Sequence, residues 1–191
     1  LYYGDSNVTS PTENPTGVWD SNFTGVWHLK EDPSGAAPQM KDSTANPHHG
    51  TSGGTMALAD QVPGQIGGSL KFDGVDDLVN LGNSSDFDVA NITLTAWAKL
   101  DSTFTDLYPK IISKGNLEVY QFYYETTYYE HKAMVRVGGV DAVATGDGET
   151  DTLRFYAMTY DGETLEYFID GGTQGKTPAH RETWTRVAVT W

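Results

Sequence analysis

Three carboxylates are concentrated in one short turn, where Asp73, Asp76 and Asp77 surround Gly74. Carboxylate oxygens are preferred ligands of hard cations, and calcium takes about six to eight oxygen ligands in proteins. Asp and Gly are also the residues that build tight turns, because an Asp side chain accepts hydrogen bonds from its own backbone. The turn is therefore either a cation site or a purely structural corner, and the sequence leaves both interpretations open.

Aromatic side chains form a second group of residues that could bind a ligand. Residues 120–129 contain five tyrosines and a phenylalanine. Exposed aromatic rings can stack on sugar rings, whereas rings on the buried face of a strand pack the core instead. Because both faces of a strand cannot be core, some of these rings should reach solvent. We expect a glycan to stack on these side chains: Tyr123, Tyr124, Tyr128 and Tyr129.

Four asparagines match the acceptor pattern for N-linked glycans, in which Ser or Thr follows two positions later. They are Asn7, Asn22, Asn83 and Asn91. Asn83 lies in the most turn-like context and is the favoured acceptor. In a chain rich in Ser and Thr some matches arise by chance, and they matter only if the source glycosylates its secreted proteins.

Charge and composition exclude several classes of function. The chain of 191 residues has a formal net charge of −14, which repels phosphate backbones and disfavours nucleic acid as a partner. It contains no cysteine, which excludes disulfides, zinc–thiolate sites and thiol catalysis. No run approaches the roughly 18 apolar residues of a membrane span. Because the chain begins with Leu1 and not Met, we expect it to be a processed or excised piece of a longer protein.

Strand and turn patterns predict the framework that positions these groups. The clearest strand covers residues 91–100. Its two faces are Ile92, Leu94, Ala96 and Ala98 on one side and Thr93, Thr95, Trp97 and Lys99 on the other. Hairpins are predicted over 117–137 and 153–169, the second with Asp161-Gly162 at its turn, and 141–151 is predicted to be an acidic loop. About ten short strands joined by Gly and Asp turns predict an all-β, antiparallel two-sheet jelly-roll sandwich.

Eight segments then follow one another in a characteristic order. They are Gly25-Val-Trp-His-Leu-Lys-Glu31, Asp42-Ser-Thr-Ala-Asn46, His49-Gly-Thr51, Pro63–Asp77, Ile92-Thr-Leu-Thr-Ala-Trp-Ala98, Ile111-Ile-Ser-Lys-Gly115, Tyr156–Gly162 and Tyr167–Gly171. Together they resemble the laminin G-like jelly-roll domains of the concanavalin A-like lectin/glucanase superfamily, as found in prokaryotic surface proteins. The resemblance covers roughly residues 25–171, and its order and spacing are more specific than any one segment.

The resemblance implies a domain organisation. Residues 1–24 would be the tail of a preceding module or a linker strand, and residues 25–191 the jelly-roll domain. Domains of this family usually end in one further strand, which this chain lacks in its usual form. Either residues 183–191 substitute for it, or a neighbouring chain supplies it, or it is missing. A sandwich without that strand would expose a sheet edge and invite self-association.

A structural calcium near the two oxygen-rich loops is also implied by the resemblance. Its ligands would be Asp42, Asn46 and Asp73, with His49 through its backbone carbonyl. Asp76 and Asp77 would then be turn formers. The linear spacing of an EF-hand loop is absent.

The same resemblance argues against a catalytic function. Laminarinase-type hydrolases of the superfamily carry Glu-x-Asp-x-x-Glu on one strand, and the nearest match, beginning at Glu149, has Arg154 where the final Glu would stand. We therefore expect a non-catalytic binding or adhesion module, extracellular or at the cell surface, whose partner is a glycan or a surface protein. The alternatives are a structural subunit of a self-associating surface layer, sheath or filament, and a remnant or accessory domain of a polysaccharide-active enzyme.

Overall fold

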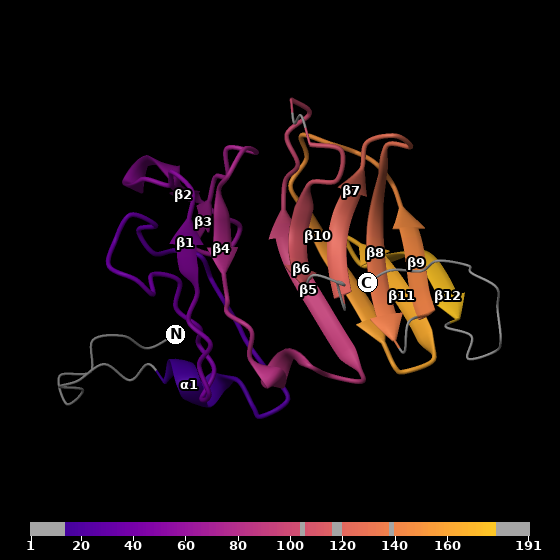
Figure 1. The fold of residues 1–191 in the computed structure, drawn as a ribbon, viewed down its shortest axis with the longest axis horizontal. Coiled ribbons are helices and arrows are strands. Elements are labelled where there is room, and N and C mark those ends of the chain that lie inside the picture. Colours follow the sequence, from indigo (N-terminus) through magenta and orange to yellow (C-terminus); the bar gives the residue numbers. More distant parts are fainter. Residues whose placement is uncertain (1–13, 104–105, 116–119, 138–139, 179–191) are drawn as a thin grey trace, which may run out of the picture. The chain divides into compact units, whose positions relative to one another are not determined.

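The computed structural model describes residues 14–103, 106–115, 120–137 and 140–178. The chain divides into two compact units, Leu1–Phe87 and Asp88–Trp191. Antiparallel strands dominate both, and the helices among the described residues are single turns (Figure 1). They are α1 (Pro15–Val18), η1 (Leu58–Asp60) and η2 (Ser85–Phe87). None of these has the length or the apolar character needed to cross a bilayer.

Two small sheets with nested pairing form the first unit. Their strands are β1 (Thr51–Gly53), β2 (Gln61–Pro63), β3 (Gly68–Leu70) and β4 (Leu78–Asn80). β2 pairs with β3, and β1 pairs with β4 on either side of them along the chain. The stretch 68–81 therefore does contain a strand, an acidic turn and a second strand. Its two strands, however, pair with other partners and not with each other.

A small core holds the first unit together. Its buried residues are Met40, Met56 and Leu70, with Trp27, Leu29 and Val79 packed against them. The indole Nε1 of Trp27 also donates to the backbone carbonyl of His48 at 2.8 Å. The backbone of Trp27 pairs with that of Asp42 in an isolated antiparallel bridge outside the named strands.

Two four-stranded antiparallel sheets form the second unit. One has the order β12–β11–β10–β5 and the other β6–β7–β8–β9 (Figure 1). Their bounds are β5 (Ile92–Ala98), β6 (Lys110–Lys114), β7 (Tyr120–Glu125), β8 (Glu130–Val137), β9 (Val140–Gly146), β10 (Arg154–Tyr160), β11 (Thr164–Ile169) and β12 (Gly172–Pro178). The buried core draws on both sheets, including Phe122 and Val135 from one and Tyr156, Met158 and Leu165 from the other. The predicted all-β, antiparallel sandwich is thus confirmed.

Local patterns placed several strands correctly. β5 buries the face that carries Ile92 and Leu94 and leaves Trp97 exposed on the other face, as predicted. β10 and β11 form the expected hairpin around Asp161-Gly162. The acidic loop predicted over 141–151 is wrong in its first half, because Asp141–Gly146 belongs to β9. Residues 183–191, one of the three alternatives for the closing strand, lie outside the described residues.

Candidate functional site

The acidic turn is held in shape by its own carboxylates. Asp73 Oδ1 accepts hydrogen bonds from the N–H groups of Val75, Asp76 and Asp77, at 2.8, 3.2 and 3.4 Å. Asp77 accepts the N–H of Asp73 on Oδ2 at 3.0 Å and that of Thr55 on Oδ1 at 3.1 Å. The bonds to Asp73, that from Val75 first, lower the pKa of its carboxyl. Asp73 is therefore ionised at neutral pH.

The same turn is a candidate cation site. Asp73, Asp76 and Asp77 each offer a carboxylate oxygen, and these oxygens lie within 4.8 Å of one another. Asp73 and Asp76 are exposed and Asp77 is half-buried. Three carboxylates match the oxygen preference of calcium and would supply part of its shell of about six to eight oxygens. The donor set therefore fits a hard divalent cation, and Asp76 and Asp77 take part in the group with Asp73.

Asp42, by contrast, is a buried acceptor for its own loop. Its Oδ1 accepts the N–H groups of Val26 and Thr44 at 2.9 and 3.0 Å. Its Oδ2 accepts the N–H of His48 at 2.8 Å and the hydroxyl of Thr44 at 3.1 Å. Burial alone would raise the pKa of Asp42, but these hydrogen bonds, led by that from His48, outweigh it and lower the pKa. The carboxylate thus organises the loop around it.

The remaining predicted ligands of this loop have protein partners. His49 Nδ1 accepts the N–H of Asp42 at 3.0 Å, and Asn46 Nδ2 donates to Asp86 Oδ2 at 3.1 Å. Within the described part of the chain, the carboxylates close enough to share an ion are those of the acidic turn, which includes Asp73 but not Asp42. Metal binding by Asp42, Asn46 and His49 stays a prediction.

The four tyrosines predicted to stack on a ligand divide into two pairs, of which the first is buried. Tyr123 and Tyr124 on β7 are 8% and 2% exposed. The ring of Tyr123 lies 6.2 Å from that of Tyr108, between centroids. Tyr124 Oη donates to the carbonyl of Gly148 at 3.0 Å. These two rings pack against the protein and present no open face to a ligand.

The second pair, Tyr128 and Tyr129, lies in the turn between β7 and β8. Their side chains are 66% and 72% exposed. Lys132 Nζ lies 5.3 Å from the centroid of the Tyr128 ring, a distance at which a cation is attracted to the ring face. Ion pairs with Glu125 and Glu130 hold that ammonium group in place. The turn therefore presents two aromatic rings on a braced hairpin.

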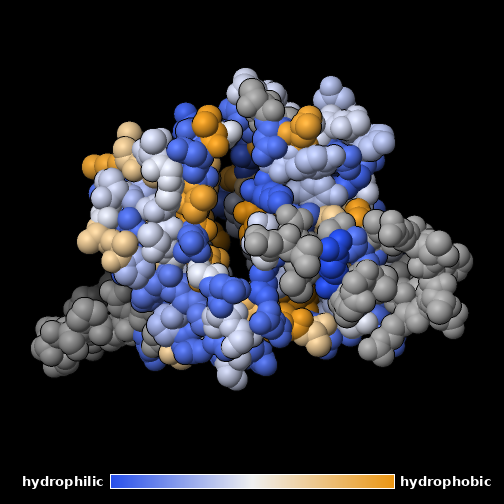
Figure 2. All heavy atoms as spheres, in the orientation of Figure 1, coloured by the Kyte–Doolittle hydropathy of each residue, from blue (hydrophilic) through white to orange (hydrophobic). Residues whose placement is uncertain are grey.

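Two further exposed apolar side chains beside this turn were missed from the sequence. Leu107 is 63% and Tyr108 46% exposed. Thr126 ties them to the turn, because its N–H and hydroxyl both donate to the carbonyl of Leu107, at 3.3 and 3.2 Å. We call Leu107, Tyr108, Tyr128 and Tyr129 the hairpin tip. Figure 2 shows hydrophobic residues at the end of the second unit where the β7–β8 turn lies in Figure 1. No linear pattern links the two segments, which strand pairing brings together.

The carboxylate nearest to a catalytic motif is engaged in ion pairs. Arg154 pairs with Glu149, with Asp170 at 3.3 Å and with Asp147 at 3.8 Å. These contacts fasten the β9–β10 loop to the start of β10. Glu149 is therefore committed to a cationic partner, and the expectation that the chain is non-catalytic stays a prediction.

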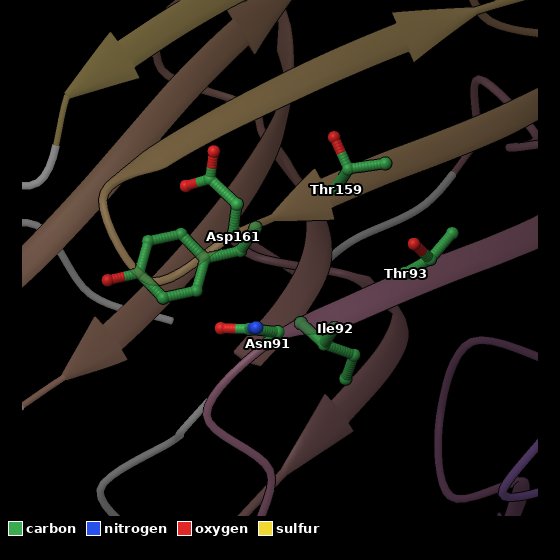
Figure 3. A pocket seen from close by; sticks show the side chains of 6 residues that line it. Asn91, Ile92, Thr93, Thr159 and Asp161 are labelled. Atoms are coloured by element: carbon green, nitrogen blue, oxygen red, sulfur yellow. The ribbon is translucent and has the colours of Figure 1, made fainter. Parts of the chain in front are cut away.

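The predicted glycan acceptors are exposed wherever the structure describes them. Asn22, Asn83 and Asn91 all reach solvent, while Asn7 lies outside the described residues. Asn91 borders a shallow pocket of about 310 Å³ at the end of β5 and β10 (Figure 3). The other residues that line it are Ile92, Thr93, Thr159, Tyr160 and Asp161.

A family model described as the concanavalin A-like lectin/glucanases superfamily, of the laminin G type, matches residues 73–191. The chain belongs to this superfamily. The matched part of this laminin G-like chain contains the acidic turn and the whole sandwich of the second unit. Comparison with curated proteins and with solved structures gave no match. Because the superfamily comprises both lectins and glucanases, membership alone does not decide between binding and hydrolysis.

Proposed function

We propose that this laminin G-like protein is a non-catalytic, extracellular adhesion module that binds a glycan through its hairpin tip. The observation that carries the proposal is the exposure of Tyr128 and Tyr129, at 66% and 72%, on a turn between two paired strands. Each ring offers an apolar face for the C–H face of a sugar, and each phenol hydroxyl can hydrogen-bond sugar hydroxyls. Membership of a superfamily that includes lectins supports the same class of ligand.

Charge favours a neutral glycan over an anionic one. The net charge of −14 repels sulfated or phosphorylated polymers. Lys132, whose ammonium group lies over the Tyr128 ring, is already neutralised by Glu125 and Glu130. The ligand is therefore expected to bind through stacking and hydroxyl hydrogen bonds, with little dependence on salt.

A glycan array probed with the full chain tests the proposal. Binding to at least one neutral oligosaccharide is expected, and the double variant Tyr128→Ala/Tyr129→Ala should abolish it. Phe23→Ala removes another exposed aromatic ring, 48% accessible, and should leave binding unchanged. Binding that survives the double variant, or an array without a single hit, would contradict the proposal. Because the module is proposed to be non-catalytic, incubating the chain with a glycan that it binds should release no new reducing ends.

Calcium is proposed as a structural cofactor of the acidic turn. The supporting observation is the group of three carboxylate oxygens within 4.8 Å, on residues whose backbone is already fixed by Asp73 and Asp77. A bound cation would offset the repulsion among these carboxylates and thereby stabilise the turn. Asp73, Asp76 and Asp77 would hold it.

Self-association through an open sheet edge is the alternative function. Among the described strands, β5 and β12 form the edges of one sheet and β6 and β9 those of the other. An unpaired edge is a template for another strand. Light scattering over a wide concentration range distinguishes the two: concentration-dependent growth supports a surface-layer or filament subunit, and a constant monomer mass rejects it.

A further inference from the structure

His131 of β8 is a buried histidine that contacts the β9–β10 loop. It is 1% exposed and lies opposite Tyr124 on β7 and Gly146 on β9. Its Nε2 lies 3.0 Å from the carbonyl oxygen of Glu149 and 3.1 Å from Tyr156 Oη. A carbonyl oxygen only accepts hydrogen bonds, so the contact with Glu149 assigns the ring proton of the neutral imidazole to Nε2.

The other ring nitrogen of His131 is buried without a partner. Its Nδ1 has no hydrogen-bond donor or acceptor in reach among the described residues. In the neutral ring this atom carries an unused lone pair. A second proton would have to be placed on Nδ1, where it would be a charged donor with no acceptor. Because a buried charged donor without an acceptor is strongly disfavoured, the protonated ring requires a movement that brings it to water or to a carboxylate.

The ionisable groups around the ring come from β7, β10, the end of β11 and the β9–β10 loop, and some act through Arg154. They are Tyr124, Tyr156, Arg154, Asp170, Asp147 and Glu149. Burial lowers the pKa of His131 to about 4; the charge of Asp147 opposes this shift and that of Arg154 adds to it. Three carboxylates share Arg154, so the local balance of charge is negative. A protonated ring that leaves its buried position therefore meets groups that stabilise it.

The loop that His131 contacts also supports the backbone of Tyr129 in the hairpin tip. Tyr129 has a φ of 56°, in the left-handed region that a bulky residue adopts only where its surroundings enforce it. Gly148 of the loop lies against the carbonyl of Tyr129, at a distance that leaves no room for a side chain. Tyr124 Oη holds the loop there by donating to the carbonyl of Gly148 at 3.0 Å. The docked loop thus keeps Tyr129 in a conformation that it would otherwise leave.

We propose that His131 is an acid-operated latch, which on protonation releases the carbonyl of Glu149, lets the β9–β10 loop move away from Tyr129 and thereby weakens ligand binding at the hairpin tip. The inference rests on the proposed function, because it concerns the regulation of the same site. An exposed histidine has a pKa near 6.5, so opening the loop takes up a proton below that pH. Opening should therefore become up to about tenfold more frequent for each pH unit between about 6.5 and about 4.

The movement can be confined to the first part of the β9–β10 loop. Further along the loop, the N–H of Asp151 donates to the carbonyl of Leu100 at 2.7 Å and anchors the chain. The ion pairs of Arg154 with Asp147 and Glu149 join side chains, so they leave the backbone carbonyl of Glu149 able to turn. The latch therefore needs no opening of the sandwich core.

NMR of the isotopically labelled full chain tests the latch without any ligand. Between about pH 7 and about pH 4 the imidazole of His131 should titrate, and the amide resonances of Tyr129 and Gly148 should shift with the same midpoint. At neutral pH the ring nitrogen shifts should identify the tautomer protonated on Nε2. The amides of Phe122 and Val135 in the core should keep their native positions. Simultaneous loss of tip, loop and core resonances would overturn the latch, because His131 would then be reached only by global unfolding.

Two variants connect the transition to His131. His131→Gln can still donate to the carbonyl of Glu149 but takes up no proton, so the resonance of Tyr129 should stay in place over the whole pH range. Asp147→Asn removes an exposed carboxylate that favours the charged ring, so the midpoint should move to lower pH. His28→Gln in the first unit is the control and should leave the transition unchanged. A transition that persists in His131→Gln overturns the latch; if that variant does not fold, an unchanged midpoint in Asp147→Asn overturns it.

Binding measurements connect the latch to the hairpin tip. A neutral oligosaccharide selected on the glycan array should bind more weakly in acid, by the same factor as the closed fraction falls in the NMR titration. His131→Gln should bind it with little dependence on pH. Equal affinity at both ends of the pH range, with the Tyr129 resonance shifted, would overturn the regulatory role of His131. Absence of binding at every pH would reject the proposed function, whereas the ligand-free titration would still decide whether the latch opens.

Discussion

The carbonyl oxygen of Tyr129 occupies the space in which a side chain on Gly148 would begin. A Cβ built on Gly148 would lie 1.5 Å from that oxygen, far inside any real contact. The β9–β10 loop is thus pressed against the turn that carries the exposed tyrosines. Tyr124 Oη reinforces this contact by donating to the carbonyl of Gly148 at 3.0 Å.

Gly148→Ala should therefore destabilise the second unit and alter the presentation of Tyr129. The clash involves backbone on both sides, so we expect a loss of about 1–3 kcal/mol in the free energy of unfolding, as for overpacked sites. Gly172→Ala is the matched control, because its Cβ would meet its nearest neighbour at an ordinary 3.5 Å. Urea unfolding curves for both variants measure the difference. Equal free energies of unfolding for the two variants would show that the β9–β10 loop can move to accommodate a Cβ at Gly148 without cost.

Acid should weaken the fold through His131. This side chain is 1% exposed, and Nε2 lies 3.0 Å from the carbonyl of Glu149 and 3.1 Å from Tyr156 Oη. Burial lowers its pKa to about 4; the charge of Asp147 opposes this and that of Arg154 adds to it. The pKa of a histidine side chain in the unfolded chain is near 6.5. As the pH falls, His131 is therefore protonated in the unfolded state before it is protonated in the folded state. Stability should fall as pH drops from about 6.5 to about 4, by on the order of 3 kcal/mol.

His131→Gln provides the comparison for this pH dependence. The variant cannot take up the proton, so its free energy of unfolding should vary less than that of the unmodified chain over the same pH range. Its absolute stability will be lower, because the packing with Tyr124 and Tyr156 is disturbed. Parallel curves for the two proteins would rule out His131 as the group responsible.

Calcium should raise the melting temperature, and a chelator should lower it. An ion that binds only the folded chain adds about 2.7 kcal/mol at a hundredfold excess over its dissociation constant. Asp73→Asn and Asp76→Asn should reduce this response, whereas Asp20→Asn, an exposed carboxylate elsewhere in the first unit, should not. A response abolished by Asp42→Asn but not by Asp73→Asn would move the site to the other loop. An unchanged melting temperature with calcium and with chelator would refute the cofactor.

Asp42→Ala should loosen the first unit even without any metal. The change leaves three backbone N–H groups without their acceptor, while the Thr44 hydroxyl keeps only the carbonyl of Asn46 as an acceptor. Buried donors without partners cost about 1–3 kcal/mol each, so a loss of at least about 2 kcal/mol is expected. Asp32→Ala, which removes an exposed acceptor of Ser34, should cost much less. Faster amide hydrogen exchange at Val26 in the first variant alone is the diagnostic result.

Local patterns in the sequence were sufficient wherever local residues decide the structure. The alternation in β5 and the Asp161-Gly162 turn each depend on near neighbours, and both were predicted correctly. The sequence predicts a loop at Asp141 because residues 141–151 are acidic and contain glycine. It is accommodated in β9 because Arg136 on the neighbouring strand pairs with it, at 2.5 Å from Nε to Oδ1, and that partner is visible only in three dimensions.

The candidate sites could be predicted only in part from the sequence, because contacts between strands decide which side chains are exposed. Adjacent tyrosines on one strand should point to opposite faces, yet Tyr123 and Tyr124 are both buried, since the ring of Tyr108 also packs near the outward one. The pairing of Trp97 with Phe155 depends on the register between β5 and β10, which are more than fifty residues apart in the chain. Residue types identified the chemistry, and strand register decided which residues could share it.

The nested pairing of the first unit also sets an order of assembly. β2 and β3 join residues as close as Pro63 and Gly68, whereas β1 and β4 must join Thr51 to Asn80. Because the entropic cost of closing a loop grows with its length, the inner hairpin should form first, and by doing so it shortens the loop that the outer pair has to close. The bond from Thr55 to Asp77 spans that outer closure. The Thr55–Asp77 bond should therefore form late in folding, when β4 pairs with β1, and a cation held by Asp77 would stabilise the unit at that step.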